Sequence, residues 1–276
     1  MLKAIKQARS AVGMLNPDEV HRRARQPVRI GLVALDGAGY AAMEDFLAPA
    51  LDQVYRAGDP GVPDKVDLVL YQQGISCPKD AKDAYVLRFD DPAATIAEIL
   101  HDHGDLDLGL ARQFAPFRKP VVERIIQAVS RENAVFAAAT ALPNLIPNLG
   151  ELPWAFGEFA SDTAFLTANQ VRMAFLIAAA CGKKVGYSER AAEILSIVGS
   201  AFGWRALARE LAGKIPFGGG IIPKGAIAYA GTYVVGKGLE HFHHAGAAYT
   251  RAQREEVYQA ALERGKAIVE AVKGKL

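Results

Sequence analysis

Apolar residues fall into two different patterns along this chain. Three short continuous runs, VRIGLVAL (28–35), KVDLVLYQ (65–72) and YVLRF (85–89), are typical of strands buried on both faces. From Leu106 nearly to the end, apolar positions instead recur with a helical period. The pattern predicts an α+β chain that is mainly α. A small three-stranded α/β segment, 28–104, precedes a multi-helix domain, 105–276.

Capping residues locate two helices in the first part of the chain. Asn16 followed by Pro17 predicts a helix start, and that helix should run to about Gln26. Asp90 or Asp91 should cap a helix that begins at Pro92 and stops at Gly104. The apolar spacing between the first two strands also predicts a helix over 41–55.

The second part of the chain reads as a series of helices. We expect a new helix to start at Pro120, because proline is favoured in the first turn of a helix and disfavoured in its interior. Further helices are predicted over 163–181, after Ser188, over 204–212 and over 251–272.

The most membrane-like stretch is IPFGGGIIPKGAIAYAGTYVVGKGL, residues 215–239. Lys224 and Lys237 bound an apolar core of 12 residues, whereas a helix that spans a bilayer needs about 20. Small residues spaced by four would let another helix approach closely; they are Ala228, Thr232 and Gly236. We expect tight packing inside a helical body, with a shallow membrane hairpin as the alternative.

Composition and charge narrow the class of protein. The chain has 276 residues, 51% of them hydrophobic, and its net charge is +2. These values suit a folded core and exclude a polycation that coats nucleic acid, so no nucleic-acid partner is expected. Cys77 and Cys181 cannot form a disulfide framework, which favours a cytoplasmic location.

The N-terminal segment 1–27 is a basic arm with six cations and two acids. Apolar residues near helical spacing leave Lys3, Lys6 and Arg9 on the other faces of a short amphipathic helix. Such a helix can rest on an anionic lipid surface, where each cation adds about 1 kcal/mol. It can equally pack against the body of the protein, and the sequence leaves both interpretations open.

A glycine-rich turn follows the first strand. A phosphate loop has the pattern G-x-x-x-x-G-K-[ST], and aligning Gly39 with its second glycine puts Ala34 at the first glycine. Tyr40 then replaces the lysine, and Ala41 replaces the hydroxyl that binds magnesium. The turn is therefore a degenerate phosphate loop, in which weak nucleotide binding would involve Asp36, Gly37, Ala38, Gly39 and Tyr40.

The sequence offers little further chemistry. His241 and His244 are i, i+3 neighbours that could share a metal ion, but no third ligand is implied and no metal site is predicted. Catalytic serine or cysteine constellations have no support in local spacing, and no nucleophile elbow occurs. We expect no catalytic residues and no cofactor.

Five phrases together resemble the YcjF-like GTPase-associated domain of unknown function. They are LARQFAPFR (110–118), ENAVFAAATALPNLIP (132–147), LTANQVRMAFLIAAACG (166–182), VGSAFGWRALARELAGKIP (198–216) and KGAIAYAGTYVVGKGLEHF (224–242). The resemblance implies a helical module that usually follows an Era-like GTPase domain and is often linked to membranes. The chain departs from that pattern because it lacks the phosphate-loop lysine, the following hydroxyl and a guanine-reading tetrapeptide.

These observations predict a non-enzymatic, degenerate GTPase-like helical protein. It would bind a protein partner, such as an intact GTPase, or associate peripherally with the cytoplasmic face of the inner membrane; a homo-oligomer is also compatible. The alternative is a nucleotide-binding protein or a slow hydrolase of nucleoside triphosphates with a non-standard phosphate loop.

Overall fold

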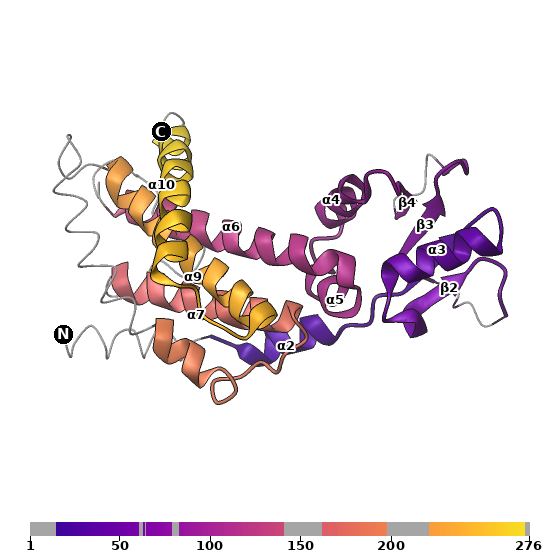
Figure 1. Ribbon diagram of the computed structural model, residues 1–276, viewed down its shortest axis with the longest axis horizontal. Helices are drawn as coiled ribbons and strands as arrows, with labels where there is room; N and C mark the ends of the chain where they lie inside the picture. The colour runs from indigo at the N-terminus through magenta and orange to yellow at the C-terminus, as the bar shows by residue number, and fades with distance from the viewer. Residues whose placement is uncertain are drawn as a thin grey trace. The chain divides into compact units, whose positions relative to one another are not determined.

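The computed structural model describes residues 15–60, 63, 65–78, 83–140, 162–197 and 221–273. The fold is α+β and mainly α, as predicted (Figure 1). Its contacts divide the chain into two compact units. The first comprises 19–123 with 179–184, and the second comprises 1–18, 124–178 and 185–276. The basic arm up to residue 14, with Lys3, Lys6 and Arg9, and the helix predicted over 204–212 lie outside the described residues.

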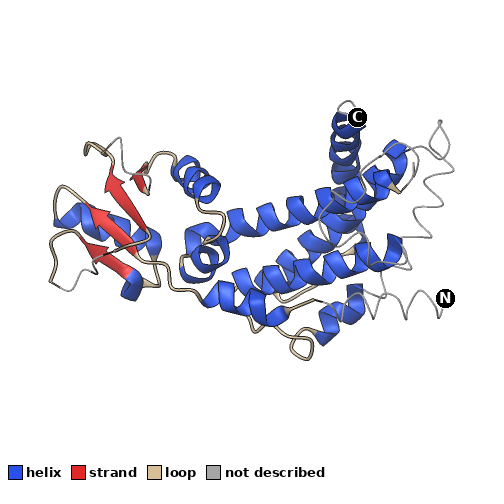
Figure 2. Cartoon of the chain, turned by 180° about the vertical axis from the view of Figure 1, so that it is seen from behind, coloured by secondary structure: helices blue, strands red, loops and turns tan. Residues whose placement is uncertain are grey.

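The first unit contains a parallel sheet, drawn as red arrows in Figure 2. Its strands are β1 (Ile30–Val33), β2 (Val54–Arg56), β3 (Leu68–Gln72) and β4 (Ala84–Leu87), in the order β2-β1-β3-β4. Ile30 pairs with both Val54 and Leu68, which places β1 inside the sheet. The three predicted strands are confirmed, but the prediction of a three-stranded segment is wrong because β2 is a fourth strand.

The extra strand takes the end of a segment that was predicted to be helical. α3 (Gly37–Leu47) is followed by a short 3₁₀ turn, η1 (Leu51–Gln53), and then by β2. The prediction of a helix over 41–55 is therefore wrong beyond Leu47. Pro49 accounts for the early end, since the residue before a proline is pushed out of helical conformation.

Two predicted helix starts are confirmed, and one is wrong. α2 (Pro17–Arg25) begins at Pro17, and α4 (Pro92–Asp102) begins at Pro92 behind the Asp91 cap. After α5 (Asp107–Gln113), however, α6 (Ala115–Ala139) starts five residues before Pro120. Pro120 removes only one backbone hydrogen bond near the helix start, and burial of Phe117 and Val121 on either side offsets that loss.

The second unit is helical. It contains most of α6 and of α7 (Asp162–Ala180), together with α9 (Ile221–Ala245), α10 (Arg251–Lys273) and a helical segment at 191–197. A Cβ added at Gly236 of α9 would lie 2.7 Å from Ile126 of α6 and 3.0 Å from Met173 of α7. The predicted close packing of the small-residue face is thus confirmed for the described part of 215–239. Among the described residues, no helix combines the length and the apolar character that crossing a membrane requires.

Candidate functional site

The glycine-rich turn lies where β1 passes into α3. Asp36 caps this helix, and its Oδ1 accepts a hydrogen bond from the backbone N–H of Gly39 at 2.8 Å. A helix N-terminus attracts anions because its first N–H groups point outward and the helix dipole is positive there. Here the chain's own carboxylate already satisfies one of these donors.

Gln72, at the end of β3, fills the inner side of the same turn. Its Oε1 accepts a hydrogen bond from the backbone N–H of Leu35 at 2.9 Å. Gly39 is buried, and a Cβ added there would lie 2.1 Å from the same Oε1. Gly39 is therefore required for the approach of the Gln72 amide, whereas in a phosphate loop the glycines leave room for phosphate. Sequence reasoning did not identify Gln72, because only strand pairing brings it to the turn.

A cation lies beside the turn, but an acid neutralises it. The guanidinium of Arg56 stands 5.3 Å from the centre of the Tyr40 ring. Its Nε and Nη2 donate to the two carboxylate oxygens of Glu44 at 2.6 and 2.8 Å. These hydrogen bonds lower the pKa of Glu44, against a smaller opposing effect of burial. Asp36, Gly37, Ala38, Gly39 and Tyr40 thus form a turn that this chain's own side chains complete.

The Glu44–Arg56 pair predicts a specific pH dependence of stability. Because the pKa of Glu44 is lower in the folded chain, its contribution is complete above the unfolded value and is lost as the pH falls through the folded value. Glu44→Gln should therefore reduce stability at neutral pH by less than about 1 kcal/mol, and the difference from the native chain should vanish in acid. Urea unfolding at several pH values measures this, and a difference that persists or grows in acid would contradict it.

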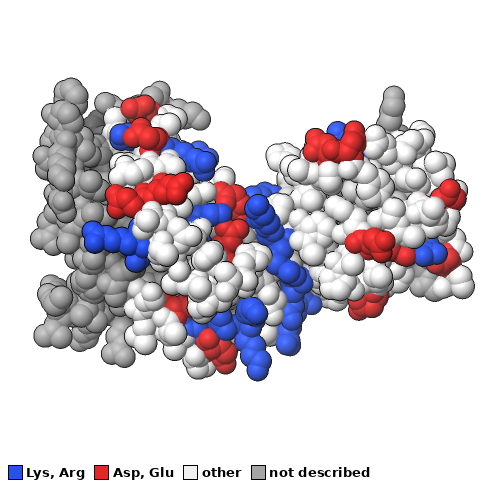
Figure 3. All heavy atoms as spheres, in the orientation of Figure 1, with Lys and Arg blue, Asp and Glu red and all other residues white. Residues whose placement is uncertain are grey.

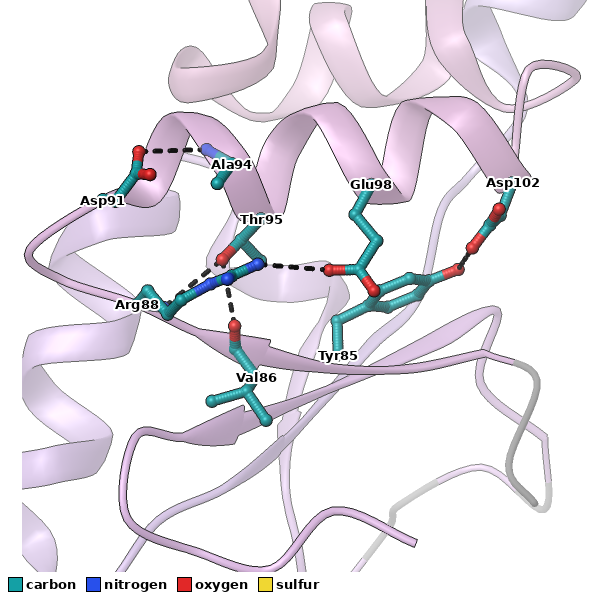
Figure 4. Close-up of polar contacts among 8 residues, drawn as sticks. All are labelled: Tyr85, Val86, Arg88, Asp91, Ala94, Thr95, Glu98 and Asp102. Carbon is teal, nitrogen blue, oxygen red and sulfur yellow. Dashed lines mark hydrogen bonds and ion pairs between the residues drawn. The ribbon is translucent and has the colours of Figure 1, made fainter. Parts of the chain in front are cut away.

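A second polar cluster joins α4 to β4 (Figure 4). Thr95 Oγ1 donates to the carbonyl of Val86 at 2.9 Å and accepts from the backbone N–H of Arg88 at 3.3 Å. Tyr85 donates its hydroxyl to Asp102 at 3.1 Å, and burial together with this carboxylate raises the pKa of Tyr85 well above its usual range. These contacts fasten the helix to the strand, so we assign the cluster a structural role.

Thr95→Val is expected to loosen this attachment. Valine keeps the shape of threonine but leaves the carbonyl of Val86 and the N–H of Arg88 without the hydroxyl, which should cost about 1–3 kcal/mol of unfolding free energy. Urea unfolding tests the expectation, with Thr95→Ser as the control that keeps the hydroxyl. Equal stability of the valine variant and the native chain would show that the hydroxyl does not hold α4.

A basic surface lies on α2. Arg22, Arg23 and Arg25, with Gln26, line a hollow of about 490 Å³. Lys and Arg side chains gather in Figure 3 where α2 lies. Ala24 is buried and packs the helix onto its unit, while the side chain of Arg22 is 79% exposed. Gln113 of α5 holds the end of this helix by donating to the carbonyl of Gln26 at 3.0 Å.

Two of the three arginines have acidic neighbours. Nη2 of Arg23 lies 3.2 Å from Asp107 Oδ1, and Nη2 of Arg22 lies 4.0 Å from Glu19 Oε1 in an exposed pair. Arg25 is exposed and forms no ion pair within the part of the chain that the structure describes. Because exposed pairs of this kind are weak, the guanidinium groups of Arg22 and Arg25 are accessible to an external anion.

The two histidines of the metal hypothesis stand near the end of α9. The ring of His241 lies 4.6 Å from that of Tyr249 between centres, with the two planes tilted by 33°, and His244 is exposed. No group of three or more histidine, cysteine or acidic side chains that could hold a metal ion occurs among the described residues. The structure therefore adds no third ligand to His241 and His244 within those residues.

Comparisons of this chain with family models, with curated proteins and with solved structures found no match.

Proposed function

We propose that this protein is a non-enzymatic binding protein that associates peripherally with an anionic membrane surface through its basic N-terminal segment. The observation that carries the proposal is the hollow on α2 lined by Arg22, Arg23 and Arg25. Planar guanidinium groups suit the phosphate oxygens of lipid headgroups, which accept paired hydrogen bonds from them.

The number and position of the cations support a surface role for α2. Basic residues in the last turn of a helix also interact favourably with its dipole, by about 0.3–1 kcal/mol. That effect falls off within one turn, and a single arginine would provide it. The arm that precedes α2 adds Lys3, Lys6 and Arg9, which gives residues 1–27 a net charge of +4. Each of these cations contributes about 1 kcal/mol near an anionic membrane.

The contacts of the turn at 36–40 support a protein that neither binds nor hydrolyses nucleotides. Asp36 places a carboxylate at the helix N-terminus where a phosphate would bind, and Gln72 takes the Leu35 N–H. A nucleotide would have to displace both groups and would meet no lysine at position 40. We therefore assign the turn to the fold.

The salt dependence of vesicle binding tests the proposal. The full chain should co-sediment with phosphatidylglycerol vesicles but not with phosphatidylcholine vesicles, and binding should fall as salt rises because charges are screened within about 8 Å at physiological ionic strength. Changing Lys3, Lys6 and Arg9 together to glutamine should weaken binding and leave the melting temperature nearly unchanged. Vesicle binding that depends on neither the salt concentration nor the lipid charge would overturn the membrane assignment and favour a protein partner.

Nucleotide binding is the second candidate, and one observation favours it. In the sheet order β2-β1-β3-β4, β2 pairs with one edge of β1 and β3 pairs with the opposite edge. The direction in which successive strands are added therefore reverses at β1. Parallel sheets bind ligands beyond the carboxyl ends of strands at such a switch point, which is where the Asp36 turn lies. Thermal unfolding with GTP or ATP and Mg²⁺ tests this, since ligand at 1,000 times its Kd adds about 4 kcal/mol of stability. A shift with either nucleotide would support this candidate.

A further inference from the structure

A pocket of about 540 Å³ lies in the helical unit, between the segment 189–197, α9 and the start of α10. This volume is within the range of pockets that bind small molecules, about 300–1,000 Å³. One wall is apolar and consists of Ile197, Val234, Val235, Leu239 and Phe242. The wall continues to the surface, where Phe242 is 43% exposed.

A neutral ion pair forms another part of the lining. Arg190 Nη1 lies 2.7 Å from Glu193 Oε1, and their side chains are only 16% and 10% exposed. The second carboxylate oxygen, Oε2, lies 3.8 Å from Nε2 of His243 and is shielded from solvent. Burial raises the pKa of Glu193, and the neighbouring Arg190 partly offsets this. The positive and negative charges of the pair cancel, so this region presents no net charge to a ligand.

Besides this pair, the pocket lining holds one further cation and one further acid. Arg254, at the start of α10, lines the same pocket and has no ion pair within the described ranges. Glu189, the other acidic lining residue, is exposed and accepts a hydrogen bond from Ser188 Oγ at 2.8 Å. A cation beside an apolar wall fits a molecule with an acidic head and an apolar chain.

We propose that this pocket binds a single-chain amphiphile with a carboxylate head, a medium-chain fatty acid in chemical class. The alkyl chain of the ligand lies against the apolar wall of α9, and its carboxylate pairs with Arg254. The proposal does not rest on the proposed function, because the pocket residues lie outside the basic segment 1–27.

Gly238 makes the pocket testable without disturbing the fold. It lies on α9 and lines the pocket, and no described atom lies within 4 Å of a Cβ added there. Gly238→Leu should therefore place a side chain in the ligand's space. It should also keep or raise the melting temperature, because glycine inside a helix costs about 1 kcal/mol relative to a good helix former.

The test is displacement of dansyl-labelled undecanoate from the intact chain by dodecanoate. Native protein should bind the probe saturably, and Gly238→Leu should weaken dodecanoate binding by at least about tenfold at an unchanged or higher melting temperature. Arg254→Gln should weaken dodecanoate binding by about threefold to fivefold and leave dodecanol binding unchanged, since the alcohol carries no charge. Arg251→Gln removes a cation of the same helix that does not line the pocket, and it should have no effect.

Two results would overturn the proposal. One is the absence of saturable probe binding by the native chain. The other is dodecanoate affinity that Gly238→Leu leaves unchanged while that variant stays folded. Equal effects of Arg254→Gln and Arg251→Gln on dodecanoate would reject the assigned head-group position and with it the proposed ligand class. None of these measurements uses vesicles, so their failure is distinct from failure of membrane association.

Discussion

Gly265→Val is expected to destabilise the helical unit by about 3 kcal/mol. A Cβ added at Gly265 of α10 would lie 2.9 Å from the carbonyl oxygen of Ala226 and 2.9 Å from Tyr229 Cβ, both on α9. Backbone atoms of a packed helix cannot move aside cheaply, so the two helices must separate. Urea unfolding measures the loss.

Gly238→Val is the matched control for this prediction. Gly238 also lies inside a helix of the same unit, but no described atom lies within 4 Å of an added Cβ. Glycine→valine should therefore be nearly neutral at 238, because the helix propensities of glycine and valine differ by only a few tenths of a kcal/mol. Similar losses at Gly265 and Gly238 would show that close helix packing is not what requires glycine at 265.

Asn133→Leu is the second substitution with a large expected effect. Asn133 is fully buried on α6; its Nδ2 donates to Thr232 Oγ1 of α9 at 2.8 Å, and its Oδ1 accepts from Asn169 Nδ2 of α7 at 2.9 Å. Leucine would remove both hydrogen bonds and leave polar groups of two other helices buried without them. The expected cost is about 2–4 kcal/mol in urea unfolding.

A double-mutant cycle separates this loss from simple misfit of leucine. Thr232→Val removes the partner hydroxyl, which also accepts from Gln170 Nε2 at 3.3 Å. If the hydrogen bond is the cause, the double variant should lose less stability than the sum of the two single variants, because fewer polar groups remain unsatisfied. Strict additivity would contradict the proposed network.

The strands and caps of the first unit could be predicted because their signals are local. Continuous apolar runs marked β1, β3 and β4, and the Asp91-Pro92 pair marked the start of α4. The sequence did not predict β2, because its three residues, Val54–Arg56, form no apolar run of their own. Its pairing with Ile30, Gly31 and Leu32 of β1 creates the strand, and such long-range pairing leaves no trace in local periodicity.

In the candidate sites, too, the sequence indicates local features but not those that depend on contacts between distant residues. The altered phosphate loop could be recognised from Tyr40 and Ala41, which stand at positions with a fixed chemical requirement. The contact of Gln72 with this turn could not be recognised from the sequence, because Gln72 lies 37 residues from its partner Leu35. The pocket around Arg254 depends on the packing of three separate segments, so no single stretch of sequence indicates it.

The central claim, that a basic N-terminal surface binds an anionic membrane, is tested most directly by partitioning to phosphatidylglycerol vesicles at one ionic strength. The test variant is Arg22→Gln with Arg25→Gln, and the control is Arg131→Gln with Arg251→Gln, which removes the same charge from exposed positions in α6 and α10. Two lost cations at about 1 kcal/mol each predict about 30-fold weaker partitioning of the test variant, and little change for the control. Equal partitioning of the two variants would contradict the claim.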